Sequence, residues 1–481
     1  MVFNSLSFLA FLAAVLVVYS VLGLRRAWKW QNIVLLIASY VSYGFWDMRF
    51  LALIAGMTVV NYVAGWAIGH PTSKAGSAST RKRLWLGLVI AFDLCVLGTF
   101  KYFNFFDDSL VRVLSSFGIH VDSVSLKLIL PIGLSFYTFQ AITYPFDIYR
   151  GKMAPTRSFL DFALFVSFFP TVVSGPIERA SHLLPQFEGP RDVTIEKINE
   201  GMWLILWGFF QKMVIADRVG LIVNQVYGDQ TQFHGLDIAI AIAAYTVQIL
   251  ADFGGYTDIA RGVARLFGFD LLLNFNVPYF AMNPSDFWTR WHISLSSWFR
   301  DYLYVPLGGN RKGRWRTSLN LLVTMVLCGL WHGAAWTFVV WGAWHGFLLV
   351  VYRFLGKIGQ SVDRTIKNWR SVLSIGGRTV FMVVLVAAGW AVFRATSFSQ
   401  VAYLFSHLGF SHSSTTISWI WQLFSFTLPL IVVQILQLRT GSPVFMARLN
   451  PWGRGVAYGC LVAGIIIFMP HQITHFIYQA F

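Results

Sequence analysis

The chain has 481 residues, of which 56% are hydrophobic and only 12% are charged. Soluble domains carry about 25% charged residues, so this composition excludes an ordinary soluble globular protein and indicates a polytopic membrane protein. The net charge of +16 comes from Lys and Arg in short connectors between apolar runs. Such connectors are typical of cytoplasmic loops and form no basic face, so we expect no nucleic-acid partner.

Apolar runs along the whole chain predict an all-α fold of roughly 11–14 transmembrane or re-entrant helices. A bilayer core takes about 20 apolar residues per span, and several runs are shorter, so we expect some partial helices. No long linker interrupts the runs, and the sequence has no internal repeat of fixed period. It therefore predicts a single membrane-embedded domain over residues 1–481. The first run has no basic flank or cleavage site, so we expect it to be retained as a helix. The predicted helices are 5–24, 31–46, 50–69, 84–103, 127–146, 158–176, 202–222, 236–252, 257–275, 317–331, 335–352, 379–393, 418–437 and 455–475.

Basic and nearly neutral connectors alternate along the first half of the chain. The basic ones lie near residues 25–30, 70–83 and 147–157, whereas Asp47 and Arg49 form a nearly neutral connector. Because basic loops stay in the cytoplasm, this alternation predicts an N-terminus outside the cytoplasm. The later basic connector at 311–316 falls on the cytoplasmic side by the same count.

The cysteines show no metal-binding or disulfide pattern. Cys95, Cys328 and Cys460 lie in separate apolar runs with no CxxC spacing, so we expect small buried residues. The histidines of the second half also lack metal-ligand spacing, and we expect no metal. The chain contains no phosphate-binding loop, dinucleotide fingerprint or Gly-x-Ser-x-Gly motif.

Two acids flank a pair of glycines at 252–258. The sequence reads DFGGYTD, with Asp252 and Asp258 at its ends. The glycines predict a break between two helices. A broken helix with acids holds an ion or a proton in transporters, and it can equally line a reaction chamber or form a structural kink.

The stretch 283–305 predicts one amphipathic helix with an aromatic face. Asn283, Pro284 and Asp286 are suited to the N-cap, first and third helical positions. At 100° per residue one face carries the aromatic residues and His292, and the other carries Arg290, Ser294, Ser297 and Asp301. The simpler alternative is an interfacial helix anchored by aromatics, with His292 as a hydrogen-bonded interior residue.

The stretch 317–352 predicts a re-entrant hairpin. Its first apolar leg, from Ser318 to Trp331, is about 14 residues long and rises only ~21 Å, which does not cross a ~30 Å core. The turn would then place His332 at membrane depth, where an ionisable residue indicates a functional site. The alternative is a histidine bonded to a neighbouring helix. His345 lies in mid-helix and suits a supporting role.

These motifs together resemble the membrane-bound O-acyltransferase family. Within it, the likeness is strongest to the membrane component of bacterial alginate O-acetyltransferase systems and its relatives in cellulose and peptidoglycan O-acetylation. It is weaker to the protein that transfers D-alanine to teichoic acid. The resemblance covers a core from the N-terminus to about residue 395, whereas the C-terminal helices of 396–481 carry no distinctive motif. The segments that carry it are LPIGLSFYTFQ (130–140), FFPTVVSGPIER (168–179), DFGGYTDIARG (252–262), FWTRWHISLSSWFRDYLYVPLGGNRKG (287–313) and GLWHGAAWTFVVWGAWHG (329–346).

The resemblance implies a bundle with a central catalytic chamber. His332 matches the family's catalytic histidine, and His292 matches the second histidine. Other positions are expected to support the site or line its channel: Asp286, Trp291, Ser294, Arg300, Asp301, Trp331, His345, Asp252 and Asp258. No bound cofactor is expected, and acetyl-CoA is the expected donor substrate.

The expected reaction is acetyl transfer to a hydroxyl group. A neutral His332 would take the hydroxyl proton during attack on the thioester and return it to the departing thiolate. The expected partners are a cytoplasmic acetyl donor, a periplasmic serine acetyltransferase with a polysaccharide synthesis complex, and membrane lipid. The expected location is the bacterial inner membrane. The competing classes are a proton-coupled transporter or flippase and a non-catalytic scaffold.

Overall fold

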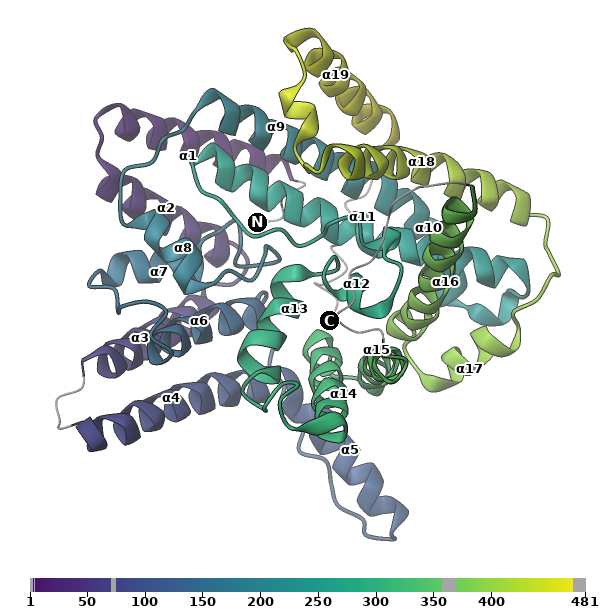
Figure 1. Ribbon diagram of the computed structural model, residues 1–481, viewed down its shortest axis with the longest axis horizontal. Coiled ribbons are helices and arrows are strands. Elements are labelled where there is room, and N and C mark those ends of the chain that lie inside the picture. Colours follow the sequence, from purple (N-terminus) through teal and green to yellow (C-terminus); the bar gives the residue numbers. More distant parts are fainter. Residues whose placement is uncertain (1–2, 4, 71–74, 357–368, 470–481) are drawn as a thin grey trace. The chain divides into compact units, whose positions relative to one another are not determined.

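A computed structural model describes residues 3, 5–70, 75–356 and 369–469 (Figure 1). Every regular element in these ranges is helical, which confirms the all-α expectation. The chain divides into two compact units: unit 1 contains Met1–Met202 and Ala260–Leu272, and unit 2 contains Trp203–Ile259 and Leu273–Phe481. The expectation of one domain over 1–481 stays a prediction.

The helices of the first half belong mainly to unit 1. They are α1 (Leu6–Leu24), α2 (Trp28–Gly44), α3 (Arg49–Gly69), α4 (Ala75–Leu97), the π-helix η1 (Gly98–Tyr102), α5 (Phe103–Ser116), α6 (Leu134–Tyr149), α7 (Phe159–Ser167) and α8 (Ala180–Phe187). Two long helices, α9 (Ile195–Phe209) and α11 (Leu236–Leu266), contribute residues to both units.

The remaining helices belong to unit 2. They are η2 (Phe210–Ala216), α10 (Asp217–Gly228), η3 (Gln230–Gln232), η4 (Pro278–Phe280), α12 (Pro284–Trp288), α13 (Ile293–Phe299), η5 (Arg300–Tyr304), α14 (Gly313–His332), α15 (Trp336–Phe354), α16 (Trp369–Arg394), α17 (Phe398–Ser406), α18 (Thr416–Thr440), η6 (Phe445–Arg448) and α19 (Pro451–Phe468). Residues 470–475 of the last predicted helix lie outside the described ranges.

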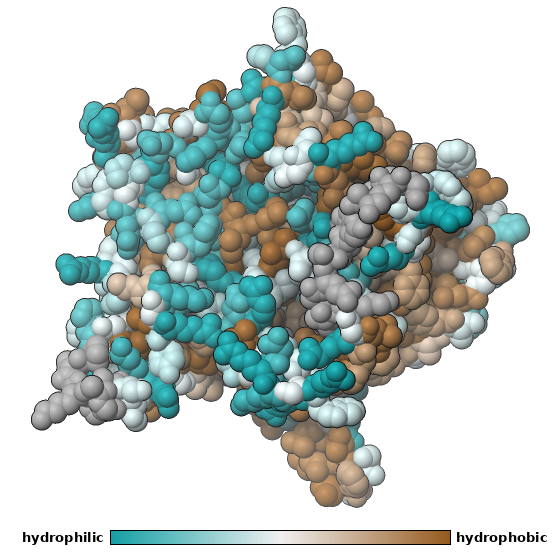
Figure 2. Space-filling view, viewed as in Figure 1, coloured by the Kyte–Doolittle hydropathy of each residue, from teal (hydrophilic) through white to brown (hydrophobic). Residues whose placement is uncertain are grey.

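Eight helices within the described ranges are long and apolar enough to cross a membrane. They are α1, α3, α11, α15, α16, α18, α19 and the continuous stretch Ser79–Ser116. Their outward side chains are apolar, as lipid contact requires. Figure 2 shows such a surface over α5, where Phe106, Leu110 and Phe117 are exposed. The structure therefore agrees with a multi-pass membrane protein.

Three predicted helix boundaries in unit 1 are wrong, each for a local reason. The helix predicted at 127–146 begins only at Leu134, because Pro131 and the left-handed Gly133 (φ 74°) precede it. The helix predicted at 158–176 ends at Ser167, and turns containing Pro170 and Pro176 follow. The helix predicted at 84–103 begins at Ala75 and continues through η1 into α5.

The predicted break at 252–258 is also wrong, because α11 runs without interruption through Gly254 and Gly255. The glycines serve close packing instead. A Cβ at Gly255 would lie 2.6 Å from the carbonyl oxygen of Gly208 on α9. A Cβ at Gly208 would likewise lie 2.6 Å from the carbonyl oxygen of Gly255. Small residues at a helix contact let two backbones approach closely, as in membrane helix pairs.

The basic connectors of unit 1 lie together, as their predicted common side requires. Trp28 and Lys29, in the first connector, line one cavity with residues 153–158 of the third. At the end of α3, Gly69 lies so close to Pro155 that a Cβ there would collide with it. Near the other end of α2, the Tyr43 hydroxyl donates to the Ile132 carbonyl at 3.0 Å.

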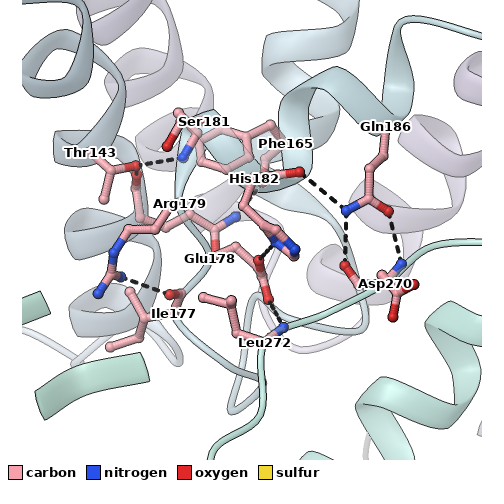
Figure 3. A network of polar contacts seen from close by, with 12 residues as sticks. Thr143, Phe165, Ile177, Glu178, Arg179, Ser181, His182, Gln186, Asp270 and Leu272 are labelled. Atoms are coloured by element: carbon pink, nitrogen blue, oxygen red, sulfur yellow. Dashed lines mark hydrogen bonds and ion pairs between the residues drawn. The ribbon is translucent and has the colours of Figure 1, made fainter. Parts of the chain in front are cut away.

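A polar clasp holds α8 to residues 270–272 within unit 1 (Figure 3). The buried carboxylate of Glu178 accepts hydrogen bonds from the Leu272 N–H at 2.6 Å and from His182 Nδ1 at 2.8 Å. Gln186 adds a two-way amide contact, donating to the Asp270 carbonyl at 3.0 Å and accepting from the Asp270 N–H at 2.8 Å. Glu178 is fully buried, so the clasp satisfies a charge that would otherwise be costly.

We expect the clasp to make stability depend on pH. The hydrogen bond to Glu178 raises the pKa of His182 above its ordinary 6.5. The stabilisation is therefore complete below pH 6.5 and is lost as pH rises through the raised pKa. Thermal unfolding of wild type and His182→Gln between pH 5.5 and 9 should show the largest difference at the acidic end. A difference that grows with pH would contradict this sign.

The contact between α14 and α15 depends on glycines in unit 2. A Cβ at Gly329 would collide with the Phe338 carbonyl oxygen, and one at Gly342 with the Met325 carbonyl oxygen. Backbone oxygens cannot move aside as flexible side chains do. The two helices can therefore pack at this distance only with glycine at both positions.

Gly329→Ala is accordingly expected to destabilise unit 2 by about 1–3 kcal/mol, the usual cost of overpacking. Gly376→Ala on α16 is the matched control, since no atom lies within 4 Å of its added Cβ. The measurement is thermal unfolding of both purified variants in one detergent. Equal unfolding temperatures for the two variants would show that the α14–α15 contact tolerates a methyl group.

Candidate functional site

Three histidines of unit 2 lie in one buried aromatic cluster. The ring centroids of His292 and His332 are 6.2 Å apart. Trp341 on α15 lies against both His332 (5.1 Å) and His345 (4.9 Å). The exposed fraction of each histidine is 2% or less. The structure therefore brings together the two histidines expected to be catalytic and the one expected to support them.

The predicted helix over 283–305 is two short helices, with His292 at the junction. Its start is confirmed: the Asn283 side chain accepts from the Asp286 N–H at 2.8 Å, and Pro284 follows. The chain then breaks, and His292 adopts the left-handed conformation (φ 43°). Such a conformation costs a non-glycine residue about 1–3 kcal/mol and is common at functional sites.

An extended segment, 274–276, causes the break. The Asn274 carbonyl accepts from the Ile293 N–H at 2.9 Å, and the Asn276 N–H donates to the Arg290 carbonyl at 2.9 Å. Asn274 Oδ1 also accepts from the Ser294 hydroxyl at 2.6 Å. These bonds satisfy backbone groups that a continuous helix would have paired internally, and they fix His292 between them.

The His292 ring is enclosed by aromatic rings. Phe253 of α11 meets it edge-on at 4.7 Å, and Trp331 lies 6.0 Å away. Within the described ranges neither ring nitrogen of His292 has a hydrogen-bond partner. Burial lowers the pKa of His292 to about 3, so the ring is neutral at physiological pH. Buried histidines usually have a hydrogen bond, and within the same ranges His345 shares the lack of one with His292.

His332 is the last residue of α14, which has 20 residues and begins at Gly313. Its first turn contains Arg314 and Arg316, so the apolar leg from Ser318 to Trp331 keeps its predicted length. The hydroxyls of Thr317 and Ser318 donate back to the carbonyls of Gly313 and Arg314 in this first turn. Within the described ranges α14 is not among the helices long and apolar enough to cross a membrane. The depth of His332 in the membrane stays a prediction.

The surroundings of His332 include two residues that the sequence did not single out. Phe393 of α16 meets the His332 ring edge-on at 5.4 Å, and Trp390 stacks on Trp341 at 5.5 Å. On α15, Trp341 shares a helix face with His345 four residues later. That spacing is a signal that could have placed Trp341 in the site.

His345 packs against α12 and α16 in unit 2. Its ring stacks on Phe287 at 5.8 Å and meets Trp288 edge-on at 5.2 Å. A Cβ at Gly389 would lie 3.1 Å from His345 Nε2. The tight fit on all sides agrees with the supporting role predicted for His345.

The expected supporting residues of the 283–305 stretch have distinct places. Trp291 is fully buried, with its ring 4.7 Å from Trp390. Asp286 accepts from Arg290 Nε at 2.6 Å and from the Met282 N–H at 3.1 Å, so it ties the start of α12 together. Arg300 and Asp301 pair with each other at 2.8 Å on the surface, outside the histidine cluster.

A cavity of about 540 Å³ lies beside the cluster in unit 2. Arg300, Arg353 and Asn310 are among its polar lining, and Met325, Cys328 and Leu349 are among its apolar lining. Trp288 forms part of its wall and also touches His345. None of the three histidines lines it, so the Trp288 ring separates this cavity from the cluster.

Asp252 belongs to a buried ion network that the sequence reasoning missed. Its carboxylate lies 2.7 Å from Lys212 Nζ, which also lies 2.8 Å from Asp217. All three side chains are at most 5% exposed. Asp258, the other expected acid, accepts from Gln211 Nε2 at 2.9 Å. A lysine inside the apolar run 202–222 was the available signal.

Residues 153–397 match the model of the membrane-bound O-acyltransferase family. The chain belongs to the membrane-bound O-acyltransferase family. It is 41% identical to a probable alginate O-acetylase, AlgI, of Pseudomonas putida over 406 residues, 84% of this chain and 79% of the relative.

Two further relatives cover large parts of the chain. The probable alginate O-acetylase AlgI of Pseudomonas aeruginosa is 42% identical over 419 residues, 87% of this chain and 76% of the relative. A peptidoglycan O-acetyltransferase of Helicobacter pylori is 36% identical over 345 residues, 66% of this chain and 64% of the relative. As a member of this family the chain is a multi-pass membrane O-acyltransferase, and the expected family is confirmed.

The matched region contains the whole histidine cluster. His292, His332 and His345 lie inside 153–397, as do Lys212 and Asp252. In α11, Asp252 immediately precedes Phe253, the ring that packs on His292. The ion network is therefore one residue along the helix from the histidine cluster.

Loss of the shared cation should destabilise unit 2 strongly. Lys212→Met leaves Asp217 and Asp252 buried without the lysine between them, and breaking a buried ion pair costs about 3–5 kcal/mol. The expected result is a large fall in unfolding temperature or loss of folded protein. Lys212→Met combined with Asp217→Asn and Asp252→Asn removes the charges and should recover much of the loss. A Lys212→Met protein as stable as wild type would refute this account.

Proposed function

We propose that the chain transfers an acetyl group from acetyl-CoA in the cytoplasm to a hydroxyl group of an exported polysaccharide of the alginate type. The observation that carries the proposal is the burial of His292 and His332 side by side in one aromatic cluster. Similarity to alginate O-acetylases over more than four fifths of the chain supports the choice of acetyl group and acceptor.

In the proposed reaction His332 is the general base. Its neutral imidazole takes the proton of the acceptor hydroxyl as the oxygen attacks the thioester carbonyl. The tetrahedral intermediate collapses with cleavage of the C–S bond, and the imidazolium returns the proton to the departing thiolate. Such positioned proton transfer contributes about 10²–10⁴ to a rate.

His292 would stabilise the intermediate. A neutral imidazole has one N–H donor, and the low pKa of His292 keeps the ring neutral. Its N–H can donate to the oxyanion in a dry, aromatic environment, where a hydrogen bond is worth more than in water. The absence of a hydrogen-bond partner on either nitrogen, within the described residues, supports this role.

The donor would enter through the 540 Å³ cavity. Arg300 and Arg353 supply positive charge, and the basic connector Arg311–Arg316 follows in sequence. Phosphate groups of acetyl-CoA are attracted to such a cluster. Movement of the Trp288 ring would then open the way from the cavity to the histidines.

The acceptor defines a second candidate function. The peptidoglycan O-acetyltransferase relative covers 66% of this chain, and a peptidoglycan hydroxyl would undergo the same chemistry. Alginate-type acceptors are favoured because those relatives match more of the chain at higher identity. We further propose that a periplasmic serine acetyltransferase, associated with a polysaccharide synthesis complex, receives the acetyl group before the polymer does.

The proposed location is the bacterial inner membrane, with the N-terminus outside the cytoplasm. The clustering of the first and third basic connectors at one cavity supports their common, cytoplasmic side. The transporter alternative loses its main support, because α11 has no break at the glycines.

The test is release of CoA from radiolabelled acetyl-CoA by the purified protein, with acceptor polysaccharide or the periplasmic partner present. His332→Ala should lower the rate by about 10²–10⁴, as expected for loss of a general base. His412→Ala is the matched control, because His412 is exposed outside the cluster. Full activity of a folded His332→Ala protein would overturn the assignment.

A further inference from the structure

A second cavity, of about 790 Å³, lies in unit 1. It belongs to no part of the reaction described above. We propose that it binds a phospholipid of the cytoplasmic leaflet whose head group carries both a phosphate and an ammonium group. The volume falls within the range of about 300–1,000 Å³ typical of small-molecule sites.

The lining is amphipathic, as a lipid site requires. Leu184 is buried, Ile33 and Leu160 are half-buried, and all three are apolar. Lys29, Arg157 and Glu188 also line the cavity, and these charged residues are exposed. Three charged side chains therefore lie at the surface and three large apolar side chains deeper in, which suits a head group above acyl chains.

The phosphate would bind between the two cations at the N-terminus of α2. This helix begins at Trp28 without a side-chain cap, and Trp28 lines the cavity. Ser158 also lines the cavity, but its hydroxyl already caps α7 by accepting from the Asp161 N–H at 3.2 Å. Backbone N–H groups at a helix N-terminus favour an anion, and the two cations add to this field. Within the described ranges the side chains of Lys29 and Arg157 form no hydrogen bond or ion pair.

Glu188 selects the ammonium group. The cavity contains a second carboxylate, Asp161, but that one accepts from Asn32 Nδ2 at 2.5 Å and is buried. The exposed Glu188 carboxylate lies at the end of α8, and no side-chain hydrogen bond of Glu188 occurs within the described ranges. A purely anionic head group would be repelled by it.

The position in the chain points to a membrane lipid. The cavity joins two basic connectors, and pockets of this kind on the cytoplasmic side bind lipid head groups. Trp30, directly after Lys29, is 62% exposed. Exposed tryptophan beside lysine is typical of the membrane–water interface.

The experiment is native mass spectrometry of the purified full-length chain, delipidated and then mixed with equal amounts of phosphatidylethanolamine and phosphatidylglycerol. Wild type should retain phosphatidylethanolamine in preference. Lys29→Ala with Arg157→Ala should weaken its retention about fivefold per cation removed. Glu188→Gln should keep binding and lose the preference. Arg112→Ala with Lys127→Ala, an exposed pair outside the cavity, is the matched control and should behave as wild type.

Equal retention of the two lipids by wild type would overturn the proposal, as would undiminished binding by the Lys29→Ala, Arg157→Ala protein. Displacement of the lipid by soluble glycerophosphoethanolamine at the same concentration would also overturn it, because the acyl chains would then contribute nothing. Acetyl transfer by each variant reports that the protein is folded, and the lipid result does not depend on which polysaccharide is the acceptor.

Discussion

The close contact of α14 and α15 is the constraint on which the histidine cluster depends. Gly329 and Gly342 let the two backbones approach to a distance that a single methyl group would prevent. His332 ends one of these helices, and Trp341 and His345 lie on the other. Aromatic side chains of α12 and α16 then complete the cluster around them. In a chain whose outer surface contacts lipid, hydrophobic burial does not drive helices together, so close packing of this kind must.

Much of the fold follows from the sequence because a membrane helix satisfies its own backbone. Long apolar runs therefore predicted most helices, and the Asn283 cap was located to the residue. The failures occur where tertiary contacts override local signals. Gly254 and Gly255 suggested a break, but they allow α11 to pack on α9. The stretch 283–305 suggested one helix, but hydrogen bonds from the extended segment at Asn274 and Asn276 divide it.

The sequence was enough to predict the histidines of the site, but not all of the residues that surround them. His292, His332 and His345 were identified because polar residues are rare in apolar runs. Lys212 meets the same criterion, but Asp217 five residues later and Asp252 on α11 form no recognisable motif with it. Trp390 and Phe393 carried no signal, because an aromatic residue in a membrane helix usually faces lipid or packs without function. Their role depends on where α16 lies relative to α15.

The two histidines of the proposed reaction need opposite properties, and their surroundings explain how one cluster supplies both. A general base must gain a proton during the reaction, whereas an oxyanion donor must keep one N–H throughout. His292 is held by bonds from Asn274 to its neighbours Ile293 and Ser294, and burial keeps its ring neutral. Its left-handed backbone conformation fixes the direction of that ring. This conformation costs free energy, which the surrounding hydrogen bonds must offset. His332 lies at a helix C-terminus, where the helix dipole favours a positive charge. The imidazolium formed during proton transfer would therefore be stabilised at His332, which supports the base role proposed for that residue.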